Sequence, residues 1–286
     1  MVLSGDQRPF SPNTYQRNSL AVKIINIAKQ VYLHRNLIDS MARRDLSAKY
    51  AGSILGWIWS FIQPFVMILV FWFIFSVGFR VRPTNDIPFV VWLTAGMAAW
   101  FIFAEIVSNS PNLVVSITNL VKKTLFPSEV LPVINILVSL FSHFIFLFIL
   151  LGLLLLQNMD FSFYFFQAVY YLVCLLVLAG GLSWGIAAVH VFIRDVGQIV
   201  GVFIQVGFWA TPIFWDAGMM SPKIQLLLKL NPMHYVVQGY RDSFIYFVPF
   251  WHHPFETVYF WAVSLVILTF GSHVFLKLKP QFADVL

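Results

Sequence analysis

The sequence predicts an all-α polytopic membrane protein, and its composition and its hydropathy pattern carry that prediction. Of 286 residues, 59% are hydrophobic and only 10% are charged, and the mean hydropathy is +0.80. Soluble domains carry about 25% charged residues. A membrane-spanning helix needs about 20 mostly apolar residues, so the structural unit of this chain is the span. We expect six spans in a single transmembrane domain, residues 51–286.

The region before the first span divides into two parts. Residues 1–31 begin as a polar stretch with two prolines, and we expect a flexible extension there. They lack the continuous apolar core and cleavage site of a signal peptide. In residues 32–50 the apolar side chains Leu33, Leu37 and Met41 share one side of a helix. This predicts an amphipathic helix in the membrane interface, the alternative being a solvated helix of a small cap.

Short polar segments separate the six expected spans. The spans cover about residues 54–79, 89–107, 133–156, 163–191, 199–212 and 258–276. Residues 108–132 are too polar to cross, and a short amphipathic helix is expected between Pro111 and Pro127. Six spans place both termini on one side. With that side cytoplasmic, 13 of the 18 Lys and Arg lie inside, as the positive-inside rule requires.

The segment between the last two spans departs from a simple span. Three prolines, two glycines and five charged residues interrupt its apolar sequence between Thr211 and Phe244. Irregular backbone at membrane depth occurs only where protein or a water-filled cavity covers it. Both ends of the segment belong on the outer side in this topology. We therefore expect a re-entrant helical pair over residues 212–247 that gates an exit.

No catalytic, metal or nucleic-acid site is expected from the sequence. The net charge is +6, but eight of the 18 basic residues precede Tyr50, which favours contact with anionic lipid over nucleic acid. There is no phosphate loop and no recognisable nucleophile–base pair. Cys174 is the single cysteine, and the adjacent His252 and His253 cannot easily supply two ligands from one helix face. Glu105 lies near the end of a span, where it either faces a bundle interior or cavity or stays hydrated at the membrane–water boundary.

Two features of the sequence each allow two interpretations: the two expected cytoplasmic loops and the tryptophans deep in the spans. Residues 112–126 and 192–198 carry charges suited to docking a motor protein, although Arg194 and Asp195 could instead form a local ion pair. Trp72 and Trp184 lie deep in their spans. Such rings could line a channel along which a sugar chain slides, or they could face lipid or the protein interior.

Four motifs together resemble the transmembrane permease subunit of ABC-type polysaccharide exporters, which handle O-antigen, capsular polysaccharide and teichoic acid. The resemblance extends over nearly the whole chain from about Tyr32. The motifs are RRDLSAKYAGSILGWIWSFIQP at 43–64, FIRDVGQIV at 192–200, TPIFW at 211–215 and LNPMHYVVQGYRDSF at 230–244. Each motif alone would be weak, and the extension before Tyr32 has no counterpart in the pattern.

The resemblance implies a homodimer bound to two copies of a separate ATPase, which would bind ATP and Mg while this chain holds no cofactor. The substrate would be an undecaprenyl-linked glycan, and the location a bacterial inner (cytoplasmic) membrane with both termini cytoplasmic. An exporter of small drugs or lipids is the alternative within the same fold. A membrane-bound transferase would need an acid–base or metal site, and a passive channel would not need two docking elements.

The resemblance also implies roles for individual residues. Arg43 and Arg44 would contact the lipid pyrophosphate, because guanidinium binds phosphate bidentately. Trp57 and Trp59 would stand at a lateral gate formed with the fifth span of the other subunit. The residues expected to couple to the ATPase are Lys122, Lys123, Arg194 and Asp195. The residues expected in the outer gate are Pro212, Trp215, Asn231, Pro232, Tyr235 and Arg241.

Overall fold

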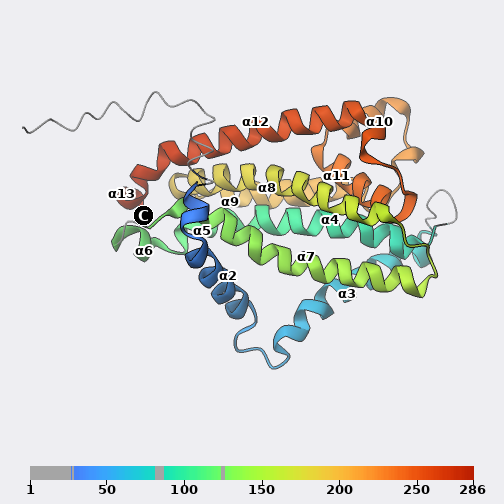
Figure 1. Cartoon of the computed structure of the whole chain (residues 1–286), viewed down its shortest axis with the longest axis horizontal. Helices are drawn as coiled ribbons and strands as arrows, with labels where there is room; N and C mark the ends of the chain where they lie inside the picture. Colours follow the sequence, from blue (N-terminus) through green and yellow to red (C-terminus); the bar gives the residue numbers. More distant parts are fainter. Residues whose placement is uncertain (1–26, 28, 81–86, 124–125) are drawn as a thin grey trace, which may run out of the picture.

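The computed structural model describes residue 27 and residues 29–80, 87–123 and 126–286, and these ranges contain helices but no strand. Its long helices run side by side along one axis of an elongated bundle (Figure 1). The α-helices are α2 (Arg35–Tyr50), α3 (Trp59–Trp72), α4 (Phe89–Asn109), α5 (Asn112–Val115), α6 (Thr118–Lys123), α7 (Leu131–Leu156), α8 (Gln167–Phe192), α9 (Val196–Ala210), α10 (Pro222–Lys229), α11 (Pro232–Arg241), α12 (Pro254–Leu278) and α13 (Phe282–Val285). Nearly all of the predicted extension 1–31 lies outside the described residues.

Within the described part of the chain, five helical segments are long and apolar enough to cross a membrane. They are Gly56–Gly78, Phe89–Asn109, Ser128–Leu156, Phe163–Phe192 and Pro254–Val285. The expected fifth span is α9, which has only 15 residues. Helix α9 stops at Ala210. A residue that precedes a proline disfavours helical dihedral angles, and Thr211, which precedes Pro212, is extended with ψ 134°. The count of six spans therefore stays a prediction.

Helix α4 lies at the centre of the bundle and α3 at its margin. In the most apolar window of α4, 78% of residues are buried inside the subunit, against 11% in the window that contains α3. Small residues such as Ala95, Gly96, Ala98 and Ala99 let α7, α8, α9 and α11 pack closely around α4. Burial on all sides makes α4 the helix against which the others are positioned.

Helices α8 and α12 form the most extensive helix pair through glycines on both helices. A Cβ atom placed on Gly181 would lie 2.6 Å from the Cα of Leu268, and one on Gly271 would clash with the carbonyl oxygen of Gly181. Gly185 faces Gly271 at the same crossing. The backbones can approach this closely only because these positions lack side chains.

Helix α2 leans away from the bundle and packs on α7 by one face (Figure 1). Ile38, Met41 and Ala42 are buried there, which agrees with an amphipathic helix. Leu33, expected on the same side, is exposed. Residues 29–33 are also helical, and a turn at His34 separates them from α2, which begins at Arg35. The placement of this region in a membrane interface stays a prediction.

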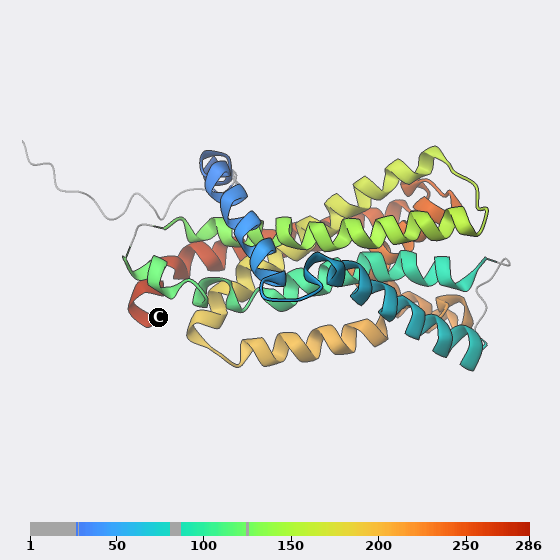
Figure 2. The same cartoon turned by 90° about the horizontal axis from the view of Figure 1, so that it is seen from below.

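Helices α3 and α9 share the least covered side of the subunit (Figure 2). In α9 only Val200 is buried, and in α3 only Ser60 and Ile68. The C-terminal ends of the two helices meet, where the ring centroids of Phe71 and Phe208 are 5.6 Å apart. Two apolar helices, distant in sequence, therefore present one continuous uncovered face.

The close contact of α8 and α12 at Gly181, Gly185 and Gly271 predicts that one added methyl group lowers stability strongly. Gly271→Ala should lower the melting temperature of the detergent-solubilised protein by about 5 °C or more, since overpacking costs roughly 1–3 kcal/mol. Gly152→Ala in α7 is the matched control, because a Cβ there meets no atom within 4 Å. Size-exclusion chromatography after heating to a series of temperatures measures the melting temperature of each variant. Equal melting temperatures for the two variants would refute the close crossing.

Candidate functional site

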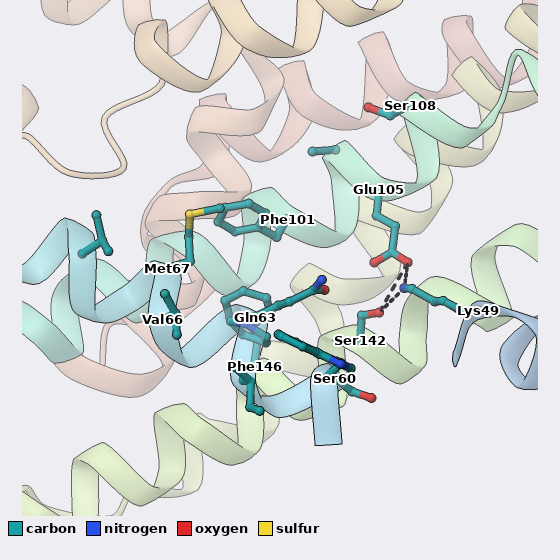
Figure 3. Close-up of a pocket in the computed structure, with 15 residues that line it drawn as sticks. Lys49, Ser60, Gln63, Val66, Met67, Phe101, Glu105, Ser108, Ser142 and Phe146 are labelled. Atoms are coloured by element: carbon teal, nitrogen blue, oxygen red, sulfur yellow. Dashed lines mark hydrogen bonds and ion pairs between the residues drawn. The ribbon is translucent and has the colours of Figure 1, made fainter. Parts of the chain in front are cut away.

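A cavity of about 650 Å³ opens between α3, α4 and α7, next to the end of α2 (Figure 3). Most of its wall is apolar, with Met67, Phe101 and Phe146 among the lining side chains. Polar groups concentrate at one end, where Glu105 and Lys49 point toward each other. A mainly apolar cavity with a few convergent polar groups is the usual form of a ligand site.

An ion pair between two distant segments forms the polar end of this cavity. The Nζ of Lys49 lies 2.8 Å from Oε1 of Glu105, and the Ser142 hydroxyl contacts both groups at 3.2 and 3.3 Å. The Glu105 side chain is 21% exposed, so Lys49 supplies the counter-charge that a carboxylate near hydrocarbon requires. Of the two interpretations of Glu105, the structure favours the one facing a cavity. Sequence reasoning assigned no role to Lys49 or Ser142.

The two arginines expected at the lipid pyrophosphate lie on the exposed side of α2, each beside an aspartate. Arg43 donates to both carboxylate oxygens of Asp39 at 2.9–3.0 Å, and this hydrogen bond raises the pKa of Arg43. Arg44 lies 2.9 Å from Asp45 and lines a second cavity of about 380 Å³. Both guanidinium groups are therefore oriented by neighbours on their own helix.

The four tryptophans singled out from the sequence have different surroundings. Trp57 and Trp59 are exposed, and Trp59 lines the 650 Å³ cavity. Trp72 is also exposed, on α3, and its role in a channel stays a prediction. Trp184 is buried and donates its indole N–H to the backbone oxygen of Glu129 at 3.1 Å. The Trp184 ring thus fills the interior of the subunit rather than an open wall.

The expected docking elements lie at the end of the bundle near the C-terminus (Figure 1). The single amphipathic helix expected in residues 112–126 is instead two short helices, α5 and α6, separated by a turn. Lys122 is exposed, whereas the side chain of Lys123 lies outside the description. Arg194 and Asp195 form an exposed turn, and no ion pair joins these two described residues.

The two docking elements are also neighbours in space. A Cβ atom on Gly197, just after the turn, would lie 3.8 Å from the Cβ of Pro111, just before α5. Ser110 and Ser183 add a buried hydrogen bond of 2.7 Å between α4 and α8 at this end. A rigid body docked on one element would therefore be positioned to contact the other.

At the opposite end, a buried arginine joins the broken segment to the bundle. The guanidinium carbon of Arg241 lies 3.4 Å from the ring centroid of Trp92, and its Nη2 donates to the carbonyl oxygen of Ile213 at 2.8 Å. Arg241 is 2% exposed. It connects α11 to α4 by a cation–π contact and to the loop after α9 by a charged hydrogen bond.

The other residues expected in the outer gate gather in the same region. Asn231 caps α11, since its Oδ1 accepts from the backbone N–H of Met233, and Pro232 is the first residue of that helix. The Tyr235 hydroxyl lies 2.9 Å from the hydroxyl of Thr257 in α12. Trp215 donates its indole N–H to the Trp209 carbonyl, and Pro212 lines a nearby cavity. Pro212 and Arg241 therefore line one cavity, while a gate formed by the six residues stays a prediction.

That nearby cavity, which we call the outer cavity, has a volume of about 550 Å³ and a polar wall. Asp242 accepts a 2.9 Å hydrogen bond from Gln238 and lies 3.6 Å from His253. Burial raises the pKa of Asp242, which is outside the candidate spans, to about 6. Burial also lowers the pKa of His234 to about 4, with smaller effects from Arg241 and Lys229. Sequence reasoning named two other residues of this cavity, Pro212 and Arg241, but missed these four, because His253 approaches residues 234–242 only in the folded chain.

Comparison with known proteins identifies relatives along almost the whole chain. The family model described as ABC-2 type transporter matches residues 36–245. The O-antigen export system permease protein RfbA of Klebsiella pneumoniae is 25% identical over 252 residues, covering 88% of this chain and 95% of that protein. The protein of the same name from Myxococcus xanthus is 28% identical over 266 residues, covering 91% and 99%.

These matches confirm the resemblance drawn from the four sequence motifs. The family match includes α2, the central helix α4, both docking elements and most of the broken segment through Ile245. A match over more than half of the chain establishes membership. The chain therefore belongs to the ABC-2 type transporter family.

Proposed function

We propose that this chain is the permease subunit of an ATP-driven exporter that moves a lipid-linked polysaccharide across a bacterial cytoplasmic membrane. The observation that carries the proposal is the similarity, over 88–91% of the chain, to permeases named for O-antigen export. ATP and Mg would be bound by a separate ATPase subunit. Both termini would lie in the cytoplasm, with residues 212–247 as the re-entrant outer gate.

The proposed assembly is a homodimer with two copies of the ATPase. The uncovered apolar face of α3 and α9 supports it, because Phe65 and Val66 on α3 and Phe203 and Val206 on α9 are all exposed. Two such faces, one from each copy, would enclose a path. Trp57 and Trp59 at the start of α3 would then border the lateral gate.

The proposed coupling route runs from the ATPase into the bundle through two adjacent contacts. Lys122 on α6 and the Arg194–Asp195 turn present charges at the same end of the subunit. The turn leads directly into α9, which belongs to the proposed dimer face. A push on the turn would therefore move a helix of the translocation path without an intervening loop.

The proposed entry of substrate uses the end of α2 and the cavity beside it. Arg43 and Arg44 would hold the pyrophosphate, and Arg44 lines the 380 Å³ cavity between α2, α4 and α7. The larger cavity beside Lys49 and Glu105 is mostly apolar, which suits the hydrocarbon of a lipid carrier. Head and tail of one lipid-linked molecule would thus find matching surroundings close together.

Depletion of the protein from its host should abolish surface polysaccharide and cause the lipid-linked glycan to accumulate on the cytoplasmic side. The reason is that synthesis of the glycan continues while its export stops. Immunoblotting of surface glycan and mass spectrometry of extracted lipid intermediates measure the two effects. Unchanged glycan pools with loss of another lipid or drug from the exported fraction would instead support a small-molecule exporter.

Reversing the charge of Arg194 should uncouple ATP hydrolysis from export. In Arg194→Glu the complex should retain basal ATPase activity but lose most export, because like charges would oppose docking at that contact. Lys277→Glu is the matched control, since Lys277 is exposed on the last turn of α12 outside both docking elements. ATPase and glycan export assays on reconstituted complexes measure the separation. Wild-type export by Arg194→Glu would eliminate the docking role.

Removing the guanidinium of Arg44 should weaken recognition of the lipid pyrophosphate. We expect Arg44→Gln to raise the half-maximal lipid-linked glycan concentration for ATPase stimulation by about tenfold, a typical loss for one charged hydrogen bond. Arg35→Gln is the control, because Arg35 is exposed at the other end of α2. Equal half-maximal concentrations in both variants would place the pyrophosphate elsewhere.

A further inference from the structure

The outer cavity lies between four segments at the α10–α11 end of the subunit. Trp92 comes from α4, Asp216 from the loop after α9, Gln238 from α11 and His253 from the residue before α12. We propose that this cavity binds a short saccharide segment of the exported chain. The proposal rests on the proposed function and adds a recognition site on the outer side.

Arg241 supplies the first argument, because it places a positive charge in the wall of the cavity. The Nη2 of Arg241 donates to the Ile213 carbonyl, and the guanidinium stacks on the Trp92 ring. Its buried Nε has no hydrogen-bond partner among the described residues. An unpaired buried N–H of a charged group is costly. Arg241 lines the cavity, but its Nε is covered by protein atoms, so a bound ligand would meet the charge of the guanidinium rather than this N–H.

Asp242 supplies the matching acceptor on the same wall. Its Oδ1 accepts from Gln238, while its Oδ2 is 3.6 Å from His253, beyond ordinary hydrogen-bond distance. A carboxylate has about four lone-pair positions, so these contacts leave acceptor capacity. His234 also lines the wall, and its neutral imidazole has one donor nitrogen and one acceptor nitrogen. The wall therefore offers donors and acceptors within one space.

This mixture favours a neutral polyhydroxyl ligand over other classes. A phosphate would meet the carboxylates of Asp216 and Asp242, and a metal ion would meet Arg241. No group of three potential metal ligands occurs in the described part of the chain. A hydrocarbon chain would leave the polar wall unsatisfied. Sugar hydroxyls both donate and accept, and Tyr246 adds aromatic surface beside them.

The size of the cavity sets the length of chain that it can hold. Its volume of about 550 Å³ falls within the range of roughly 300–1,000 Å³ that is usual for small-ligand pockets. That is room for a short saccharide rather than a polymer. The site would therefore hold one segment of the chain at a time, next to the loop that follows α9.

The test measures binding of a defined probe to the intact complex of permease and ATPase in nanodiscs. The probe is the host's own surface glycan, freed of lipid by mild acid and fractionated to short oligosaccharides, titrated in a calorimeter. Asp242→Asn should weaken binding by about tenfold or more, the usual effect of losing a charged acceptor. Asp160→Asn, an exposed carboxylate in the turn after α7, is the matched control and should bind as wild type.

A second variant guards against misfolding of the first. His253→Ala removes a side chain that is 41% exposed, so the fold should tolerate it, and it should also weaken binding. The proposal is overturned if the wild-type complex does not bind the probe, or if both variants bind it as wild type does. Normal glycan export with no such binding would refute this site alone. Unaltered glycan pools after depletion would refute the exporter function itself.

Discussion

The buried guanidinium of Arg241 is the contact on which the broken segment after α9 depends. Backbone that leaves a helix inside a membrane protein exposes carbonyl groups, and each must find a donor. Arg241 satisfies one of them, at Ile213, and stacks on Trp92 of the central helix. Arg241 therefore joins α11 to α4 and to the segment after α9, where the 2.9 Å hydrogen bond from Asn231 to Thr211 adds a second link.

The central position of α4 follows from the same requirement. A Cβ on Gly96 would lie 3.0 Å from Nη2 of Arg241 and 3.4 Å from the Ile213 carbonyl oxygen. Glycine there leaves space for the guanidinium to reach its acceptor. At the other end of α4, Glu105 takes Lys49 from α2 as its partner. The central helix thus anchors a charged residue from a peripheral segment at each of its two ends.

Much of the fold could be predicted because span formation depends on local composition. Runs of apolar residues indicated where long helices lie, and Pro212 indicated where α9 ends. The sites were less accessible, because pairs such as Lys49–Glu105 are separated by 56 positions and leave no local pattern. Trp184 illustrates the same limit of sequence reasoning. Its depth in a span suggested a channel, but only tertiary contacts place its indole on Glu129.

The distribution of polar groups separates the subunit into two chemically different ends. Near α2 the cavity is apolar with one ion pair at its edge, which suits a molecule with a hydrocarbon tail and a charged head. Near α11 the cavity has a mixed polar and apolar wall, whose charged and amide side chains suit hydroxyl groups. A lipid-linked glycan has both chemistries in one molecule and presents them in sequence as it moves outward. The two cavities therefore fit the proposed lipid-linked substrate, whereas a transporter of one small apolar molecule would gain nothing from the second.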